Sequence, residues 1–276
     1  MNFLQGLAAV ILAVPTSAFA VSFDLTERAK SDFGLTYEGD YYTMSRHFSE
    51  GGIKLSVAAF SGGYNTGHYE ERYGQTGHDV RRDWVSVSGS GDGLGAGGIG
   101  GLWPDNGLDN HGLVAEMMLL SFDQAVSLDF VHINWSYADS DMTILAYTGT
   151  DATRFTYGQY ARDTFVGKKW DDGLAQHWDG GHFLDVANRG NTVAANPKGL
   201  TSYSWLVGAH MRPLDNVEVL SDNPYQDYLS DFVKLSAIDV SVVHEVPEID
   251  ANQSGIAFGL LLGLIAYIRE RRRKHM

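Results

Sequence analysis

Two groups of carboxylates are the residues of this chain whose spacing comes nearest to known chemistry. Asp105, Asp109 and Glu116 stand at the first, fifth and twelfth places of a twelve-residue stretch, which is part of the calcium-ligand spacing of an EF-hand. The match is incomplete, because Gly107 takes a ligand place and a strand rather than a helix is expected to follow. The spacing disfavours an EF-hand and leaves two main interpretations. One is a calcium ion held between a loop and a strand; the other, which we favour, is two turns whose side chains cap their own backbone.

Asp139 and Asp141 form the second group and flank a single serine, so both carboxylates face the same side of an extended chain. Such a pair could supply the acid and the base of a glycosidase if a sugar cleft lay between them. The neighbouring residues do not indicate such a cleft, so metal binding or a turn is the favoured interpretation. We therefore expect no catalytic residue, no enzymatic activity and no required cofactor, with calcium as an optional ligand. The candidate calcium ligands are Asp105, Asp109, Glu116, Asp139 and Asp141.

Histidines and aromatic residues give weaker signals. His177 and His182 lie five residues apart and would bind a transition metal only if a turn brought them together, so we expect surface loop residues. Aromatic residues make up 12% of the chain, enough for a sugar-stacking platform, and some lie in polar, glycine-rich stretches where rings can be exposed. The same rings could instead cover the ends of the fold. The residues concerned are Tyr64, Tyr69, Tyr73, Trp170 and Trp178.

A glycine-rich stretch over residues 89–101 contains the pattern G-x-G-x-x-G from Gly95 to Gly100. A dinucleotide-binding turn needs a helix directly after this pattern, and Pro104 follows too closely to allow a helix interior. We expect a loop here and no dinucleotide site.

The elements that must position all these residues are predicted to be β-strands. Blocks of β-branched and aromatic residues are separated by glycine-rich joins, and residues 21–244 contain no long amphipathic helical pattern. Short strands with turn-rich connections are typical of all-β sandwiches, and we predict one jelly-roll-like β-sandwich over residues 21–244. The predicted strands are Ile53–Ser61, Trp84–Ser88, Val114–Phe122, Val126–Trp135, Met142–Thr148, Ser202–Ala209 and Asp231–His244.

Net charge and cysteine content disfavour nucleic-acid binding and exclude thiol chemistry. The segment from residue 255 onward holds five of the 20 Lys and Arg residues and one of the 34 Asp and Glu residues. Residues 1–254 therefore have 15 basic and 33 acidic residues, which gives a net charge of −18. Phosphate recognition needs basic patches, so nucleic-acid binding is disfavoured. The chain has no cysteine and therefore no disulfide or thiolate site. A body of this size can bury a sufficient core without them.

The first 20 residues predict a signal peptide. They carry no charge, hold an apolar run from Leu7 to Val14, and end in small residues around Ala18 and Ala20, the pattern of a cleavage site. Cleavage is expected after Ala20. The secretion machinery is therefore an expected partner.

The C-terminal end divides into a linker with a short motif at 245–254, an apolar segment at 255–268 and a basic tail at 269–276. As a transmembrane helix the apolar segment would span about 21 Å, short of the roughly 30 Å hydrocarbon core, so we expect a marginal anchor. The basic residues stay in the cytoplasm by the positive-inside rule, which leaves the acidic body beyond the inner membrane. The motif is Val246, Pro247, Glu248, Ile249 and Asp250, and the basic residues are Arg269, Arg271, Arg272, Arg273 and Lys274.

This three-part tail resembles the sorting signal of exosortase substrates, the PEP-CTERM class of bacterial surface proteins, in its Val-Pro-Glu-Ile-Asp variant. Over roughly residues 90–276 the chain also resembles a family of exosortase-dependent surface proteins of the XDP1 type. The resemblance implies an exosortase as partner, export and surface display, with no established catalytic activity. The segments that carry it are residues 105–110, 116–123, 138–149, 181–186, 203–209 and 231–235.

Two functions from different classes are therefore expected. The favoured one is an exported, non-catalytic cell-surface or extracellular-matrix protein, first an inner-membrane precursor and then processed by an exosortase. The alternative is a surface-displayed carbohydrate-binding module, with or without calcium, that contacts extracellular polysaccharide; a polysaccharide-degrading enzyme is less favoured. An exposed row of aromatic rings over a concave sheet would favour binding, and a convex, acidic sandwich without a pocket would favour the structural role.

Overall fold

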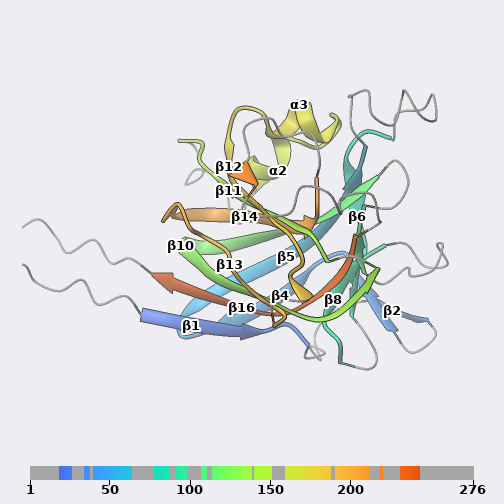
Figure 1. Ribbon diagram of the computed structural model, residues 1–276, viewed down its shortest axis with the longest axis horizontal. Helices are drawn as coiled ribbons and strands as arrows, with labels where there is room; N and C mark the ends of the chain where they lie inside the picture. The colour runs from blue at the N-terminus through green and yellow to red at the C-terminus, as the bar shows by residue number, and fades with distance from the viewer. Residues whose placement is uncertain are drawn as a thin grey trace, which may run out of the picture. The chain divides into compact units, whose positions relative to one another are not determined.

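The part of the chain that the structure describes consists mainly of β-strands, as the sequence predicts. The computed structural model describes residues 19–26, 34–37, 40–63, 78–87, 91–97, 107–110, 114–138, 140–150, 159–187, 190–211, 218–219 and 231–242. Residues Ala18–Val243 group into one compact unit (Figure 1).

One long strand, β10 (Ala115–Ala138), belongs to two sheets. Its N-terminal half pairs with β5 (Ile53–Gly62) and β14 (Ser202–Ala209), and its C-terminal half pairs with β13 (Thr192–Ala194) and β16 (Asp231–Val242). The register with β14 shifts between Ser121 and Val126, where β10 passes from one sheet to the other. Such an irregularity bends a strand, and here it carries the chain around one end of the fold.

The first sheet, which we call the covered sheet, runs from β4 (Arg46–Glu50) and β6 (Arg81–Asp83) through β5, β10 and β14 to β11 (Met142–Tyr147), β12 (Trp178–Phe183) and β15 (Glu218–Val219). The second, which we call the open sheet, places β16 between β10 and three strands along its other edge. These are β1 (Phe19–Asp24), β8 (Leu94–Ala96) and β9 (Leu108–Asp109). From β8 the open sheet continues through β7 (Val85–Val87) and β3 (Asp40–Thr43) to β2 (Gly34–Tyr37).

The main hydrophobic core lies between the two sheets, because each sheet contributes one face of alternating apolar side chains. Phe23 of β1 meets Phe122 of β10 edge to face, with ring centroids 6.2 Å apart. Two sheets packed over one core form a sandwich, as predicted. The jelly-roll connectivity stays a prediction. Core residues of the covered sheet include Leu55, Val57, Met118, Leu120, Ile144 and Val207, and those of the open sheet include Val21, Leu128, Val131, Leu235, Ile238 and Val240.

A second core lies on the other face of the covered sheet, under a segment with two short helices, α2 (Gln159–Asp163) and α3 (Trp170–Leu174). Figure 1 shows these helices on one side of β11, β12 and β14, with β16 and β1 on the opposite side. Phe165 packs edge to face on Phe60 at 5.1 Å, and the indole N–H of Trp170 donates to the Ala115 carbonyl at 3.1 Å. The covered sheet is thus buried on both faces, which explains why all six residues of β11 are buried.

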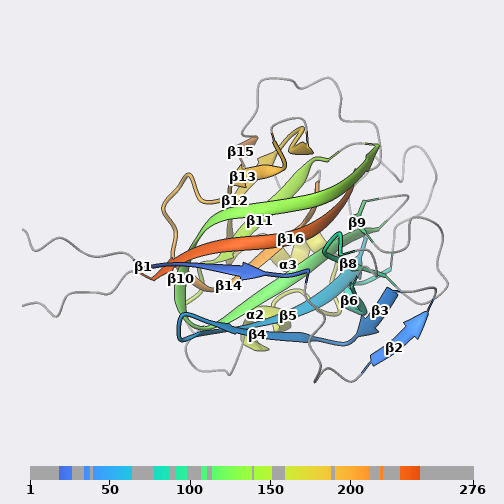
Figure 2. The ribbon, with the colours of Figure 1, turned by 90° about the horizontal axis from the view of Figure 1, so that it is seen from below.

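The first and last strands of the compact unit lie side by side (Figure 2). β1 and β16 are antiparallel, and Phe19 stands opposite Val242. The two ends of the unit therefore meet at the same end of the open sheet. The predicted cleavage bond after Ala20 falls inside β1, while the inward-facing Val21 and Phe23 follow it. Ala18 lies outside the described residues.

Most predicted strands are confirmed, with two corrections. The predicted strands at 114–122 and 126–135 are the two halves of the single strand β10. The stretch 89–101, expected to be a loop, contains β8, which closes the gap between β7 and β16. Gly93, just before β8, has a φ of +122°, and a Cβ there would lie 2.2 Å from the Leu235 carbonyl oxygen. Glycine is required at this close approach, so a glycine-rich sequence here serves strand pairing.

Among the described residues no helix is long and apolar enough to cross a membrane. The predicted transmembrane helix at 255–268, the sorting motif at 246–250 and the basic tail lie outside those residues.

Candidate functional site

Two of the five predicted calcium ligands meet where β9 approaches β10. The backbone N–H of Asp109 donates to Glu116 Oε2 at 3.3 Å, so the contact links strand β9 to strand β10. Asp105 and Asp139 lie outside the described residues. Within the described ranges, no three His, Cys, Asp or Glu side chains are grouped so as to hold a metal ion. The five-residue calcium site stays a prediction.

The fifth predicted ligand, Asp141, is only 4% exposed and belongs to a buried hydrogen-bond network. Its Oδ1 accepts the backbone N–H of Asp185 at 2.7 Å, and its own N–H donates to Asp231 Oδ1 at 3.1 Å. Asn110 Oδ1 accepts the N–H of Asp231 at 2.8 Å, and Asn110 Nδ2 donates to Asp231 Oδ2 and to the His210 carbonyl. We call Asn110, Asp141 and Asp231 the polar clasp.

The polar clasp joins the two sheets at one end of the sandwich. Asp231 begins β16 in the open sheet, whereas Asp141 precedes β11 and the His210 backbone follows β14 in the covered sheet. Its carboxylates accept backbone and amide donors, as buried polar groups in native proteins generally do. The arrangement stabilises the fold, and both of its carboxylates are buried.

The two histidines predicted to lie at the surface differ in burial: His182 is buried and His177 is half-buried. The prediction is wrong for His182, which lies in β12, is 2% exposed and contacts the Thr143 hydroxyl through Nδ1 at 2.7 Å. The same hydroxyl accepts the N–H of Met211 at 2.8 Å. Strand β12 is buried because it pairs with β11, where His182 stands opposite Thr143. The ring of His182 also packs edge to face on His210 at 4.5 Å.

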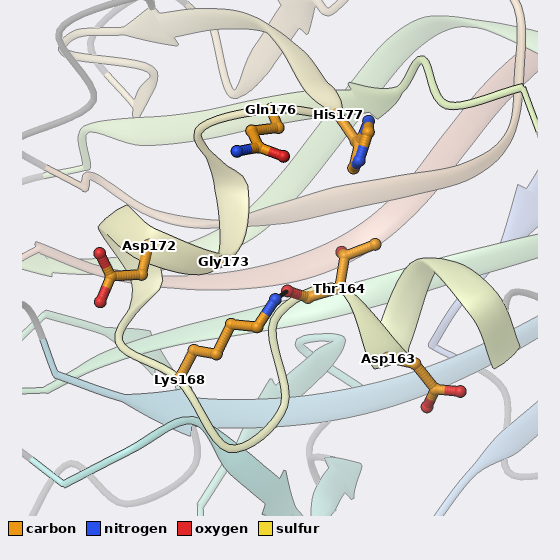
Figure 3. Close-up of a pocket in the computed structure, with 7 residues that line it drawn as sticks. All are labelled: Asp163, Thr164, Lys168, Asp172, Gly173, Gln176 and His177. Atoms are coloured by element: carbon orange, nitrogen blue, oxygen red, sulfur yellow. Dashed lines mark hydrogen bonds between the residues drawn. The ribbon is translucent and has the colours of Figure 1, made fainter.

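His177 is half-buried and lines a surface pocket of about 270 Å³ in the helical segment (Figure 3). Lys168 extends across this pocket, where its Nζ donates to the Thr164 carbonyl at 2.6 Å. Figure 3 shows the carboxylates of Asp163 and Asp172 pointing away from each other on opposite sides. A glycosidase needs two carboxylates that converge on one bond, and these two diverge.

Of the two interpretations left open for these aromatic residues, a sugar-stacking platform does not fit either tryptophan, because both are buried. Trp170 is completely buried and Trp178 is 7% exposed, because both pack around Phe165 in the second core. The Trp178 indole N–H donates to Thr164 Oγ1 at 3.0 Å. These rings hold the helical segment on the covered sheet. The three tyrosines of the prediction, at 64, 69 and 73, lie outside the described residues.

A different row of aromatic rings lies on the solvent-facing side of the open sheet. Phe130 is 42% exposed and Tyr137 is 49% exposed, although both are large apolar side chains in a central strand. Trp135 lies between them, with its ring nearly parallel to that of Tyr137 at a centroid distance of 6.5 Å and an angle of 13°. We call this surface the aromatic face. Its rings are Phe130, His132, Trp135 and Tyr137 of β10, and the buried Phe232 of β16 packs edge to face against Tyr137.

Polar groups are interspersed along the aromatic face. His132 contacts Asp239 Oδ2 through Nε2 and Thr192 Oγ1 through Nδ1, each at 3.0 Å. Lys234 places its Nζ 5.2 Å from the centroid of the Trp135 ring. The face thus combines flat apolar surfaces with hydrogen-bonding side chains from three adjacent strands.

Asp239 is the ionisable group of this face whose pKa is shifted by its surroundings. Partial burial, the largest influence, acts to raise the pKa of Asp239, but hydrogen bonds from Ser22 and His132 and the charge of His132 lower it below its ordinary value. The carboxylate is therefore ionised at neutral pH and presents a hydrogen-bond acceptor at the surface.

One signal for the aromatic face is visible in the sequence. Phe130 and His132 are two residues apart, as are Trp135 and Tyr137, which puts each pair on one side of a strand. Val131 and Ile133 between them are also apolar, so the sequence does not tell which side is buried. Register irregularities of β10 against β16 near Phe130 and Ile133 then bring the two pairs onto a common face.

Comparison with known proteins identifies the C-terminal segment. Residues 246–276 match the VPEID-CTERM protein sorting domain. No curated protein and no solved structure matches the chain. The predicted PEP-CTERM-like sorting signal is therefore confirmed, and the resemblance of the body to the XDP1 type stays a prediction.

Proposed function

We propose that this chain is an exported, non-catalytic cell-surface or matrix protein whose tail delivers it to an exosortase. The match of residues 246–276 to a VPEID-CTERM sorting domain carries the proposal. Such a signal implies export and surface display through a step at the membrane. The acidic all-β body is then the part that remains outside the cell.

The position of the two ends of the body supports this function. Because β1 and β16 are antiparallel neighbours, the first described strand begins and the last described strand ends at the same end of the open sheet. A body that is attached by one end leaves its remaining surface accessible.

Signal-peptide cleavage after Ala20 is compatible with this fold. The residues lost from β1, Phe19 and Ala20, are both exposed. Val21 and Phe23, which pack in the main core, would remain paired with β16. The cleaved strand would keep the pairs from Val21 to Asp24, and its apolar contribution would be intact.

The burial and the directions of the carboxylates support a non-catalytic body. Asp141, one member of the predicted acidic pair, is buried and accepts a backbone hydrogen bond within the polar clasp. A general acid or base must reach the atom to which it transfers a proton. Asp163 and Asp172 of the surface pocket point apart (Figure 3).

The test is a double variant of the sorting motif, Pro247→Ala with Glu248→Ala, compared with a control, Glu245→Ala with Asn252→Ala, that flanks the motif. In cells that contain the exosortase, we expect the motif variant to accumulate in the inner membrane at full length, because the motif is the element recognised there. The control should mature like the unmodified protein. Membrane fractionation followed by intact-mass measurement distinguishes the forms. Normal maturation of the motif variant would contradict exosortase recognition.

A further inference from the structure

We infer that the aromatic face binds a neutral polysaccharide chain that lies along β10. The exposure of the rings is the first reason. Phe130 and Tyr137, at 42% and 49% exposed, lose the benefit of burial on a strand whose opposite side is fully packed. His132 and Trp135 lie half-buried between them, and exposed aromatic surface on a folded domain is typical of a binding site.

The length of the row indicates a polymer. Phe130 stands opposite Asp239 of β16, and Tyr137 stands opposite Phe232, so the row follows most of the ladder between the two strands. At about 3.3 Å per residue, the distance from Phe130 to Tyr137 is roughly 20 Å. That length accommodates several sugar rings in succession. It exceeds what a monosaccharide would cover.

The orientation of the rings suits stacking against sugars. Trp135 reaches across β16, so that a Cβ at Gly107 would lie 3.5 Å from its Cζ3, and its ring therefore lies over the sheet surface. Tyr137 is nearly parallel to it. Flat aromatic surfaces with a polar edge bind ligands that have both apolar and polar groups, and a pyranose has an apolar C–H face and hydroxyls at its rim.

The polar groups supply hydrogen bonds for those hydroxyls. Asp239 has carboxylate lone pairs beyond those that His132 and Ser22 use, and Thr192 can both donate and accept. All three side chains lie beside Phe130 in the register of β13, β10 and β16. A hydrogen-bonding group next to a stacking ring fixes the orientation of a sugar on that ring.

Charge decides which polymer fits. The body carries a net charge of −18 over residues 1–254, and the ionised Asp239 lies on the face itself. A polymer of uronates or phosphates would be repelled, as would a second copy of the body docked through the same face. An uncharged polysaccharide has no such penalty and donates hydrogen bonds to the carboxylate.

This inference rests on the proposed function in one respect: the protein must be displayed outside the cell to encounter extracellular polysaccharide. Binding itself depends on the aromatic face and is measured with purified protein. A failure of binding would leave exosortase processing unaffected, and a failure of processing would leave binding in the purified protein unaffected.

The experiment is affinity electrophoresis of the full-length chain, purified in mild detergent, through gels that contain dextran, xylan, mixed-linkage β-glucan or polygalacturonate. The test variant is Phe130→Ala with Tyr137→Ala. The control is Val166→Ala, which removes an exposed apolar side chain from the helical segment instead. Circular dichroism melts of all three proteins establish that each is folded.

We expect retardation by at least one of the three neutral polysaccharides, none by polygalacturonate, and a loss of affinity of about tenfold or more in the double variant because two stacking contacts are removed. The Val166→Ala protein should be retarded like the unmodified chain. The inference is overturned if no neutral polysaccharide retards the protein, if polygalacturonate retards it more, or if the folded double variant binds unchanged.

Discussion

The covered sheet and the open sheet are built from the same kind of strand and differ in what lies outside them. In the N-terminal half of β10, Met117 and Leu119 face the helical segment while Met118 and Leu120 face the main core. In the C-terminal half, Val131 and Ile133 face the main core while Phe130 and Tyr137 face solvent. A single strand thus passes from a sheet buried on both faces to a sheet with one free face.

This difference assigns stability mainly to the covered sheet and binding to the open sheet. A sheet buried on both faces gains hydrophobic stabilisation from the apolar residues of each face. A sheet with one exposed face needs polar residues there for solubility, so large aromatic rings on that face indicate binding. Three predictions test this division, and the binding experiment described above complements them.

The two sheets can be compared through the stability lost when a tryptophan of each, Trp170 or Trp135, is replaced. Trp170→Ala should lower the free energy of unfolding by about 3–5 kcal/mol, because it leaves a cavity between the helical segment and the covered sheet and removes the hydrogen bond to Ala115. Trp135→Ala on the aromatic face, where the ring is half-buried, should cost about 1 kcal/mol. Urea denaturation monitored by far-ultraviolet circular dichroism measures both. Equal losses would show that the aromatic face is a packed core rather than a free surface.

The polar clasp tests the connection between the sheets. Asp231→Ala leaves the N–H of Asp141 without its acceptor and removes one of the two acceptors of the Asn110 side-chain amide, so it should lower the free energy of unfolding by about 2–3 kcal/mol. The control is Asp79→Ala, which removes the exposed ion pair with Lys169 and should cost less than about 1 kcal/mol. If the two variants unfold at the same urea concentration, the polar clasp contributes no more than a surface ion pair does.

Asp239→Asn should have the smallest effect and a pH dependence of known sign. The pKa of Asp239 is lowered in the folded protein, so the unfolded chain binds its proton more readily and the carboxylate stabilises the fold above its unfolded pKa of about 3.9. The variant should therefore be less stable at pH 7 by no more than about 1 kcal/mol, since the pair with His132 is one-third exposed. The difference should decrease as the pH falls through the folded pKa. Urea midpoints at pH 7, 5, 4 and 3 measure it, and a difference that grows with acid would contradict the assignment.

Sequence patterns predicted the strands that have long apolar blocks and missed those that depend on distant partners. β14 begins at Ser202 and ends at Ala209 as predicted, because its apolar run is bounded by polar residues and a loop. β8, β9 and β13 have two or three residues each and exist because β16 and β10 supply their hydrogen bonds. Local sequence contains no such information. The second core was also missed, since nothing local indicates that Phe165 and Trp170 cover a sheet.

The candidate site follows the same pattern. Phe130 and His132 are two residues apart and so lie on one side of a strand, yet the choice of the solvent-facing side depends on which sheet packs beneath β10, and the sequence analysis did not identify them. The pairing of Asp141 with Asp231, 90 residues apart, could not be anticipated from spacing. The sorting tail, by contrast, is a linear signal whose meaning does not depend on a fold, and the match to a sorting domain confirms the signal predicted from residues 246–250 and the segments that follow.

Intact-mass spectrometry of the protein recovered from the cell surface tests the central claim most directly, because it reads both ends of the chain at once. The account predicts a polypeptide that begins at Val21 and has lost the basic tail with Arg269 to Lys274, a result of signal-peptide cleavage and exosortase processing. Recovery of the chain only from the cytosol, with Met1 and Met276 both present, would contradict it.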